Sequence, residues 1–297
     1  MLLRKYGFNY KKRIRRKYKS NSIIKQTLLI IMLLSLISNF CISRLYLIRE
    51  PIAIKSYDLE AIANFHIHND VLVAIEDYAI EEEKDFYDVL VNTMIHYDFS
   101  ALDEDIIDLN KVKKVKQNNE YEALVGLYQM ILEDIRFFPI AYNLNSQYEE
   151  YYYGDTWLAS RSYGGERLHY GTDIMDSNNT RGYLPIVSMT DGVVENIGWL
   201  EKGGYRIGVR APSGAYFYYA HLYTYTGDIN QGDTIKAGEL LGFMGDSGYG
   251  EEGTIGMFDV HLHMGISVPL KHQSEEYWVN PYWILRYIED NKINFWY

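Results

Sequence analysis

Two short stretches of the chain carry side chains that can bind a metal. Asp259-Val260-His261-Leu262-His263 holds two histidines separated by one residue in an apolar, strand-like run. Because side chains alternate along a strand with a period of two, both imidazoles should face the same side of a sheet. Upstream, His169-Tyr170-Gly171-Thr172-Asp173 offers a histidine and an aspartate on a predicted glycine-containing turn. Imidazole nitrogen and carboxylate oxygen are ligands of catalytic zinc, and three of them leave a fourth position for water.

The cysteine content limits the kind of metal site that the chain can build. Cys41 is the only cysteine, so an intramolecular disulfide and a thiolate zinc site are both excluded. An isolated pair of histidines with this spacing is usually a surface or core feature. The interpretation as a metal site therefore depends on the motifs around it.

Those motifs form an ordered series between about residues 154 and 286. Its members are Arg167-Leu168-His169-Tyr170-Gly171-Thr172-Asp173, Asp191-Gly192-Val193-Val194, Tyr219-Ala220-His221-Leu222, Gly232-Asp233-Thr234-Ile235-Lys236-Ala237-Gly238, Gly245-Asp246-Ser247-Gly248, His261-Leu262-His263 and Asn280-Pro281. In this order the series resembles the lysostaphin/LytM-type zinc metallopeptidases. The resemblance implies a mainly antiparallel β peptidase domain.

The resemblance also implies the roles of five residues. His169, Asp173 and His263 occupy the family's ligand positions for Zn2+, which lowers the pKa of a bound water and polarises the scissile carbonyl. His221 and His261 are the candidates for catalytic proton transfer and for stabilising the oxyanion, and the sequence does not divide these tasks between them. All five positions are filled, which argues against the non-catalytic members of the family.

The resemblance predicts a membrane-anchored zinc metalloendopeptidase that hydrolyses stem or cross-bridge peptides of bacterial peptidoglycan. Two alternatives stay open at this point: a catalytically silent cell-wall or division scaffold, and a wall-opening accessory of a secretion or conjugation system. The chain departs from the family at Asp246-Ser247, where an Asn-Thr pair is common. It also has an insertion at Ser177–Gly182 and a longer approach to His261 at Gly248–Asp259. These loops border the expected groove and leave its substrate preference open.

Charge divides the chain into a basic tail and an acidic body. Residues 1–26 contain ten Lys or Arg and no acidic residue. Since the whole chain has 29 basic and 40 acidic residues, the rest carries a formal charge of −21. Such a body should not bind nucleic acid through bulk charge.

The segment that follows the basic tail is predicted to be a membrane anchor. Thr27–Ser43 contains no charged residue and would span about 26 Å as a helix, so an anchor over residues 27–48 is expected. The positive charges before it place the N-terminus in the cytoplasm and the peptidase domain outside. A buried helix is disfavoured by the basic tail, and a cleaved signal peptide by the absence of an A-x-A-like site.

The chain after the anchor is predicted to form two parts. Residues 50–147 are poor in glycine and show apolar residues at helical spacing, which predicts a module or stalk of three or four helices with a loop at Lys111–Asn119. His66-Ile67-His68 falls in a predicted helix, where residues i and i+2 do not face each other, so no metal site is expected there.

Residues 148–297 are predicted to form the peptidase domain from short antiparallel strands. A closing helix over Tyr282–Asp290 is expected to begin with Asn280 as its cap and Pro281 at its first position. The expected strands are Ile186–Met189, Gly192–Trp199, Tyr205–Arg210, Ala215–His221, Thr234–Ile235, Leu240–Met244 and His261–Val268.

Overall fold

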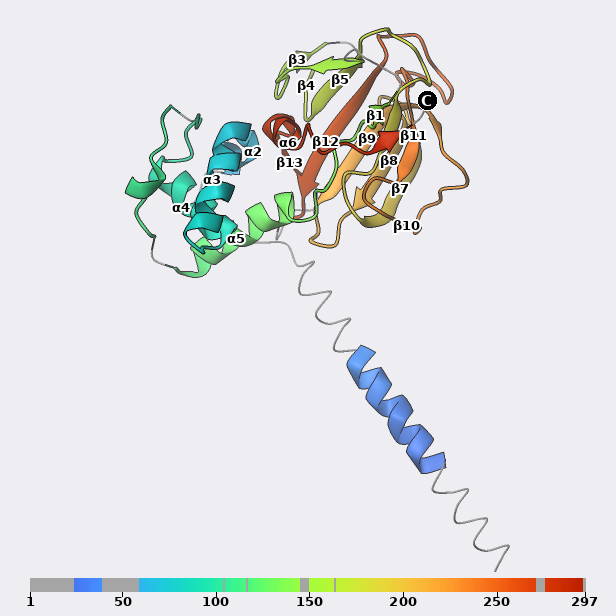
Figure 1. The fold of residues 1–297 in the computed structure, drawn as a ribbon. Helices are drawn as coiled ribbons and strands as arrows, with labels where there is room; N and C mark the ends of the chain where they lie inside the picture. The colour runs from blue at the N-terminus through green and yellow to red at the C-terminus, as the bar shows by residue number, and fades with distance from the viewer. Residues whose placement is uncertain are drawn as a thin grey trace, which may run out of the picture. The chain divides into compact units, whose positions relative to one another are not determined.

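Figure 1 shows the computed structural model of the chain. The structure describes residues 24–38, 59–103, 105–115, 117–144, 150–162, 164–270 and 276–295. Residues 1–50 and 51–297 form two compact units, and each is described by itself.

The first unit contains a helix over residues 24–38, whose side chains are exposed. Within the described ranges, no helix is both long and apolar enough to cross a membrane. Residues 1–23 of the predicted basic tail and residues 39–48 of the predicted anchor, with Cys41, lie outside the described residues. The anchor therefore stays a prediction.

The second unit begins with four α-helices, where three or four were predicted: α2 (Leu59–Asn64), α3 (Asn69–Glu81), α4 (Phe86–His96) and α5 (Asn119–Leu132), with a short 3₁₀ helix at Leu109–Lys111. Helix α5 begins where the Asn118 side chain accepts the backbone N–H groups of Glu120 and Tyr121. The prediction that His66 and His68 lie in a helix is wrong. They flank Ile67 between α2 and α3, because Ile67 forms a β-bridge with Leu102.

A ten-stranded sheet forms most of the second unit, and all its strand pairs are antiparallel, as predicted. Its central path runs β10-β7-β8-β9-β12-β5-β2, with β11 beside β9 and β6, and β13 beside β12. The strands are β2 (Tyr151–Tyr153), β5 (Thr172–Asp176), β6 (Pro185–Val187), β7 (Gly192–Leu200), β8 (Gly204–Arg210), β9 (Tyr216–Tyr225), β10 (Thr234–Ile235), β11 (Leu240–Met244), β12 (His261–Val268) and β13 (Tyr277–Val279). A separate hairpin pairs β3 (Ser160–Arg161) with β4 (Arg167–Leu168).

The structure corrects two predictions of local structure. Asp173 lies in strand β5 and not on a turn, because residues 172–175 pair with β12. Helix α6 spans Tyr282–Tyr287, shorter than predicted, and Pro281 is its N-cap residue. The prediction that Asn280 is the cap residue is therefore wrong, although its side-chain oxygen accepts the Tyr282 N–H at 3.0 Å.

The helical region packs against the sheet through one continuous hydrophobic core. Figure 1 shows α2 to α5 grouped beside the sheet. Helix α3 contacts α6, and helix α5 contacts strand β12. The connecting segment also joins the sheet: Ile135 and Ile140 form bridges to Thr190 and Ile186. At its end, β1 (Tyr142–Asn143) pairs in parallel with β14 (Asn294–Phe295). The boundary between residues 147 and 148 stays a prediction, and residues 135–143 contribute to the core of the sheet domain.

This packing predicts that Phe138 stabilises the sheet domain. Its side chain is fully buried, and its ring stacks on Tyr151 with centroids 5.2 Å apart. Phe138→Ala should lower the free energy of unfolding by about 3–5 kcal/mol, because it removes a buried aromatic ring and leaves a cavity. Urea unfolding of the full chain measures this value. Tyr142→Ala is the control, since Tyr142 lies in the same segment and is 49% exposed; an equal loss in both variants would contradict the prediction.

Candidate active site

The pairing of β5 with β12 brings two of the three predicted ligands together, Asp173 and His263. In this antiparallel pair Asp173 lies directly opposite His263, and His261 lies opposite Met175. Asp173, His261 and His263 all line one groove, as expected for residues with period-two spacing on the same face. The prediction that the two histidines of β12 share a face is confirmed.

His169, Asp173 and His263 form a compact set of donor atoms. The Asp173 Oδ1 atom lies 3.0 Å from His169 Nε2 and 3.0 Å from His263 Nδ1, and these two nitrogens are 2.9 Å apart. A triangle with sides of about 3 Å allows one ion to lie about 2.0–2.2 Å from all three atoms, the distance zinc takes from His and carboxylate ligands. The residues present therefore fit a zinc ion.

Neighbouring groups orient the ligands. His169 Nδ1 lies 2.9 Å from the Thr156 carbonyl oxygen, so Nδ1–H donates to it and Nε2 keeps its lone pair for a metal. Arg161 Nη2 donates to Asp173 Oδ2 at 2.6 Å, which leaves Oδ1 turned toward the histidines. The sequence alone gives no signal for this role of Arg161, because nothing in its spacing relates it to the ligand motifs.

The Asp173 side chain is held as a carboxylate. Burial by itself raises the pKa of this group, but its close contacts with the His169 and His263 rings and the electrostatic influence of His263 and His261 hold its pKa far below the usual range. A deprotonated carboxylate is the form that coordinates a metal.

A β-bulge places His221 in the groove. The register between β8 and β9 shifts between Tyr205–Leu222 and Ile207–Tyr219, which leaves one extra residue in β9. His221 has φ 62°, so both Ala220 and His221 line the groove although they are adjacent in the strand. The His221 backbone N–H donates to the Gly203 carbonyl at 2.9 Å.

The two remaining histidines present free nitrogens to the groove. His221 Nδ1–H donates to the Ser247 carbonyl at 2.8 Å, and His261 Nδ1–H donates to the Asp259 carbonyl at 2.7 Å. Each Nε2 is therefore left as a proton acceptor. Their ring centroids are 4.7 Å apart, and His261 Nε2 lies 3.8 Å from Asp173 Oδ1.

The surroundings of both of these histidines favour the neutral imidazole. Burial lowers the pKa of His221 well below its ordinary value, and the neighbouring His261 and His263 lower it further, because each would repel a second positive charge. Burial also lowers the pKa of His261, although the Asp173 carboxylate acts in the opposite direction. A neutral imidazole with one bonded N–H is suited to accept a proton.

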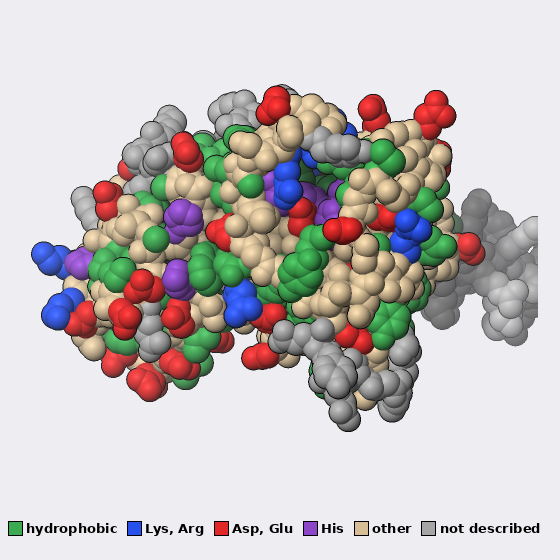
Figure 2. Space-filling model, turned by 90° about the horizontal axis from the view of Figure 1, so that it is seen from above, with side chains coloured by type: hydrophobic (Ala, Val, Ile, Leu, Met, Phe, Trp, Pro, Cys, Tyr) green, Lys and Arg blue, Asp and Glu red, His purple; other side chains and the backbone are tan. Residues whose placement is uncertain are grey.

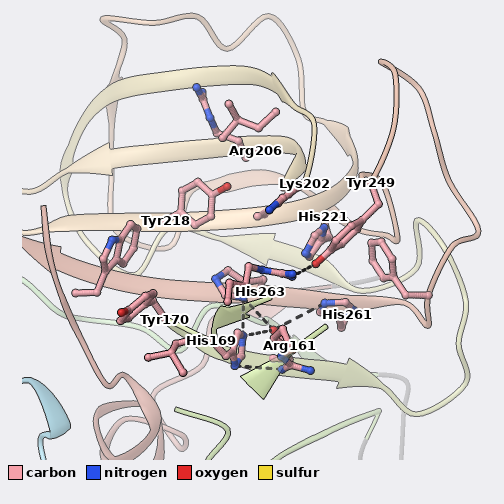
Figure 3. Close-up of a pocket in the computed structure, with 18 of the residues that line it drawn as sticks. Arg161, His169, Tyr170, Lys202, Arg206, Tyr218, His221, Tyr249, His261 and His263 are labelled. Atoms are coloured by element: carbon pink, nitrogen blue, oxygen red, sulfur yellow. Dashed lines mark hydrogen bonds and ion pairs between the residues drawn. The ribbon is translucent and has the colours of Figure 1, made fainter. Parts of the chain in front are cut away.

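The groove around these residues has a volume of about 800 Å³. Figure 2 shows it as a hollow with histidine side chains at its bottom and Lys or Arg beside them. Figure 3 shows Tyr170 and Tyr218 on one side of the metal-site residues and Lys202 and Tyr249 on the other. An elongated ligand such as a peptide can thus extend to both sides of the metal site.

An ion pair and hydrogen bonds connect the predicted insertion at 177–182 to neighbouring segments beside the groove. Arg181, from the insertion at 177–182, pairs with the buried Asp246 carboxylate at 2.5 Å. Asn179 accepts the Val260 N–H at 2.7 Å and donates to the Asp259 side chain at 3.2 Å. The insertion therefore fixes the segment that leads into β12.

Comparison with known proteins identifies the family of the chain. Residues 167–280 match Peptidase family M23. The crystal structure of a Ruminococcus gnavus protein provisionally named a glycyl-glycine endopeptidase, lytM, shares 40% sequence identity with a TM-score of 0.67, over 84% of this chain and 97% of that one. The chain belongs to peptidase family M23.

Two curated relatives match the M23 part of the chain. The L-Ala–D-Glu endopeptidase of Bacillus subtilis is 43% identical over 117 residues, which are 39% of this chain and 35% of that protein. Lysostaphin of Staphylococcus simulans is 32% identical over 108 residues, which are 36% of this chain and 20% of lysostaphin. The match thus spans about a third or less of these proteins.

Family M23 is zinc-dependent, in agreement with the donor set of His169, Asp173 and His263.

The geometry predicts different effects of the two β12 histidines on metal binding. His263→Ala removes a donor atom and leaves two, so zinc affinity should fall by about a hundredfold or more. His261→Ala leaves the three donor atoms in place and should retain one zinc per chain. Metal analysis and competition with a chelator on the purified variants measure both. Loss of zinc in His261→Ala with retention in His263→Ala would invert the ligand assignment.

Proposed function

We propose that this chain is a membrane-anchored zinc metalloendopeptidase that hydrolyses peptide bonds in bacterial peptidoglycan. The observation that carries the proposal is the convergence of three metal donors with two neutral histidines in one groove. The L-Ala–D-Glu endopeptidase of Bacillus subtilis, which is similar to the M23 part of the chain, supports an endopeptidase activity. Lysostaphin-type motifs across residues 154–286 favour wall peptides as the substrate class.

The surroundings of each residue in the groove suggest its role in catalysis. His169, Asp173 and His263 would hold zinc, which supplies an activated water and polarises the scissile carbonyl when bound. His221 and His261 each offer an unbonded Nε2, so one accepts a proton as water attacks, and a protonated imidazole returns it to the leaving amine nitrogen. Arg161 positions the Asp173 ligand by its bond to Oδ2.

Turnover measurements test this proposal. The full chain loaded with zinc should release peptide fragments from purified peptidoglycan and defined muropeptides, as read by mass spectrometry. His221→Ala and His261→Ala should each lower kcat by about a hundredfold or more while zinc is retained, because each removes a proton-transfer group. Arg136→Gln, at an exposed position away from the groove, is the control. Zinc-loaded, folded wild-type protein without any turnover would favour the silent scaffold.

The membrane anchor in this proposal rests on sequence. The ten positive charges in residues 1–26 precede the uncharged Thr27–Ser43 segment, which favours an N-terminus in the cytoplasm and a peptidase domain outside. That location would place the groove beside the cell wall.

Fusion of a reporter to the C-terminus tests the topology. A reporter that works only outside the cytoplasm should be active and remain with the membrane fraction. A reporter active only in the cytoplasm would contradict the predicted orientation. Release of a shortened protein from the membrane would show that the segment is cleaved. Replacing the basic residues of the tail with Gln should weaken the orientation preference, because these charges set it.

A further inference from the structure

Arg206 places an unpaired positive charge in the groove. It lies in β8 and lines the groove, while its neighbours Ile207 and Tyr205 point to the other face. Its Nη1 atom is buried without a hydrogen-bond partner, and within the described ranges its guanidinium makes no hydrogen bond or ion pair. Arg206 is therefore a cation without a partner among the residues that the structure describes.

The next basic residue on the same face of β8 shows the contrast. Arg210 pairs with Glu195 at 2.6 Å and with Glu276 at 2.6 Å, and it also donates to the Gly214 carbonyl. Burying a charged nitrogen without a partner costs free energy, and a partner recovers much of that cost. Among the described residues, Arg210 thus has several partners and the Arg206 guanidinium has none. This difference indicates that the partner of Arg206 is a ligand.

The position of Arg206 relates it to the metal site. Ala220 of β9 pairs with His263, and Arg206 lies opposite the Ala220–His221 bulge between two paired positions of β8. Two strand spacings, about 10 Å, therefore separate the backbones of Arg206 and His263. Figure 3 shows Arg206 beyond Tyr218 as seen from His263. A residue of a bound peptide spans about 3.5 Å, so a substituent one or two residues from the scissile bond lies within reach of the guanidinium.

The charge of the groove favours an anionic group at this position. Its described lining contains four cationic side chains, Arg161, Arg167, Lys202 and Arg206, and one acidic side chain, Asp173. Arg161 already pairs with Asp173. A cationic groove in a chain of net charge −11 concentrates anions locally. The planar guanidinium matches a carboxylate in two parallel hydrogen bonds.

We propose that Arg206 binds a free carboxylate of the substrate peptide and makes the groove selective for acidic peptides. A glutamyl residue within a peptide keeps one free carboxylate, whichever of its carboxyl groups lies in the chain. A glycyl-glycine bond offers no such group. The inference rests on the proposed peptidase function and specifies the substrate class: a bond next to an acidic residue, in preference to a glycine bridge.

Two peptides that differ in one group provide the test. One contains an L-Ala–D-Glu bond with the free carboxylate, and the other carries a carboxamide in its place. With the zinc-loaded full chain, kcat/KM for the acidic peptide should exceed that for the amide by about tenfold or more, the scale of a hydrogen bond to a charged group. In Arg206→Gln this ratio should fall to about one, through loss of activity on the acidic peptide alone. Arg206→Lys should restore part of the ratio, because it keeps the charge and loses the paired geometry.

Controls and a binding measurement separate the possible failures. Lys113→Gln removes one positive charge from an exposed position of the helical region and should leave the ratio unchanged. Equal loss on both peptides in Arg206→Gln, or a wild-type ratio near one, would overturn the role of Arg206 while the peptidase function stands. Equilibrium binding to zinc-loaded His261→Ala reports the same preference without turnover. If the chain cleaves neither peptide but binds the acidic one selectively through Arg206, the peptidase function alone is refuted. If it binds neither peptide, the inference about Arg206 is refuted.

Discussion

The antiparallel pairing of β5 with β12 is the constraint on which the site depends. It sets Asp173 opposite His263, and the alternation of side chains then places His261 on the same face. A shift of the register by one residue would turn the histidines away from the groove. Leu262 and Ile174, on the opposite face, are both fully buried, so the hydrophobic core fixes the register. The core thereby determines the positions of the metal donors.

The β-bulge at His221 is the second device that the site needs. A regular strand would point His221 into the core, opposite to Ala220. The extra residue in β9 and the positive φ turn it into the groove, a conformation that costs free energy for a residue with a side chain. Hydrogen bonds to the Gly203 and Ser247 carbonyls offset this cost. The turn after β11 therefore serves as a support for a proposed catalytic residue.

Asp173 and Arg206 differ in whether the protein neutralises their charge. The Asp173 carboxylate is satisfied by histidines and by Arg161, so its negative charge is used within the protein. Arg206 is the opposite case, because its charge has no partner among the described residues. The same sheet thus carries two kinds of charged group. The Asp173 carboxylate has partners within the protein, and the Arg206 guanidinium is proposed to find its partner in the substrate.

The sequence by itself predicted the antiparallel strands and three or four helices before them, because periodicity is a property of neighbouring residues. The five histidine and aspartate positions came from the resemblance of its motifs to a family. The sequence placed Asp173 on a turn and left Arg161 and Arg206 unnoticed. Those features depend on strand register, on a bulge and on side chains from separate strands meeting across a groove. Only tertiary structure decides such contacts, since they join residues that the sequence does not relate by any spacing.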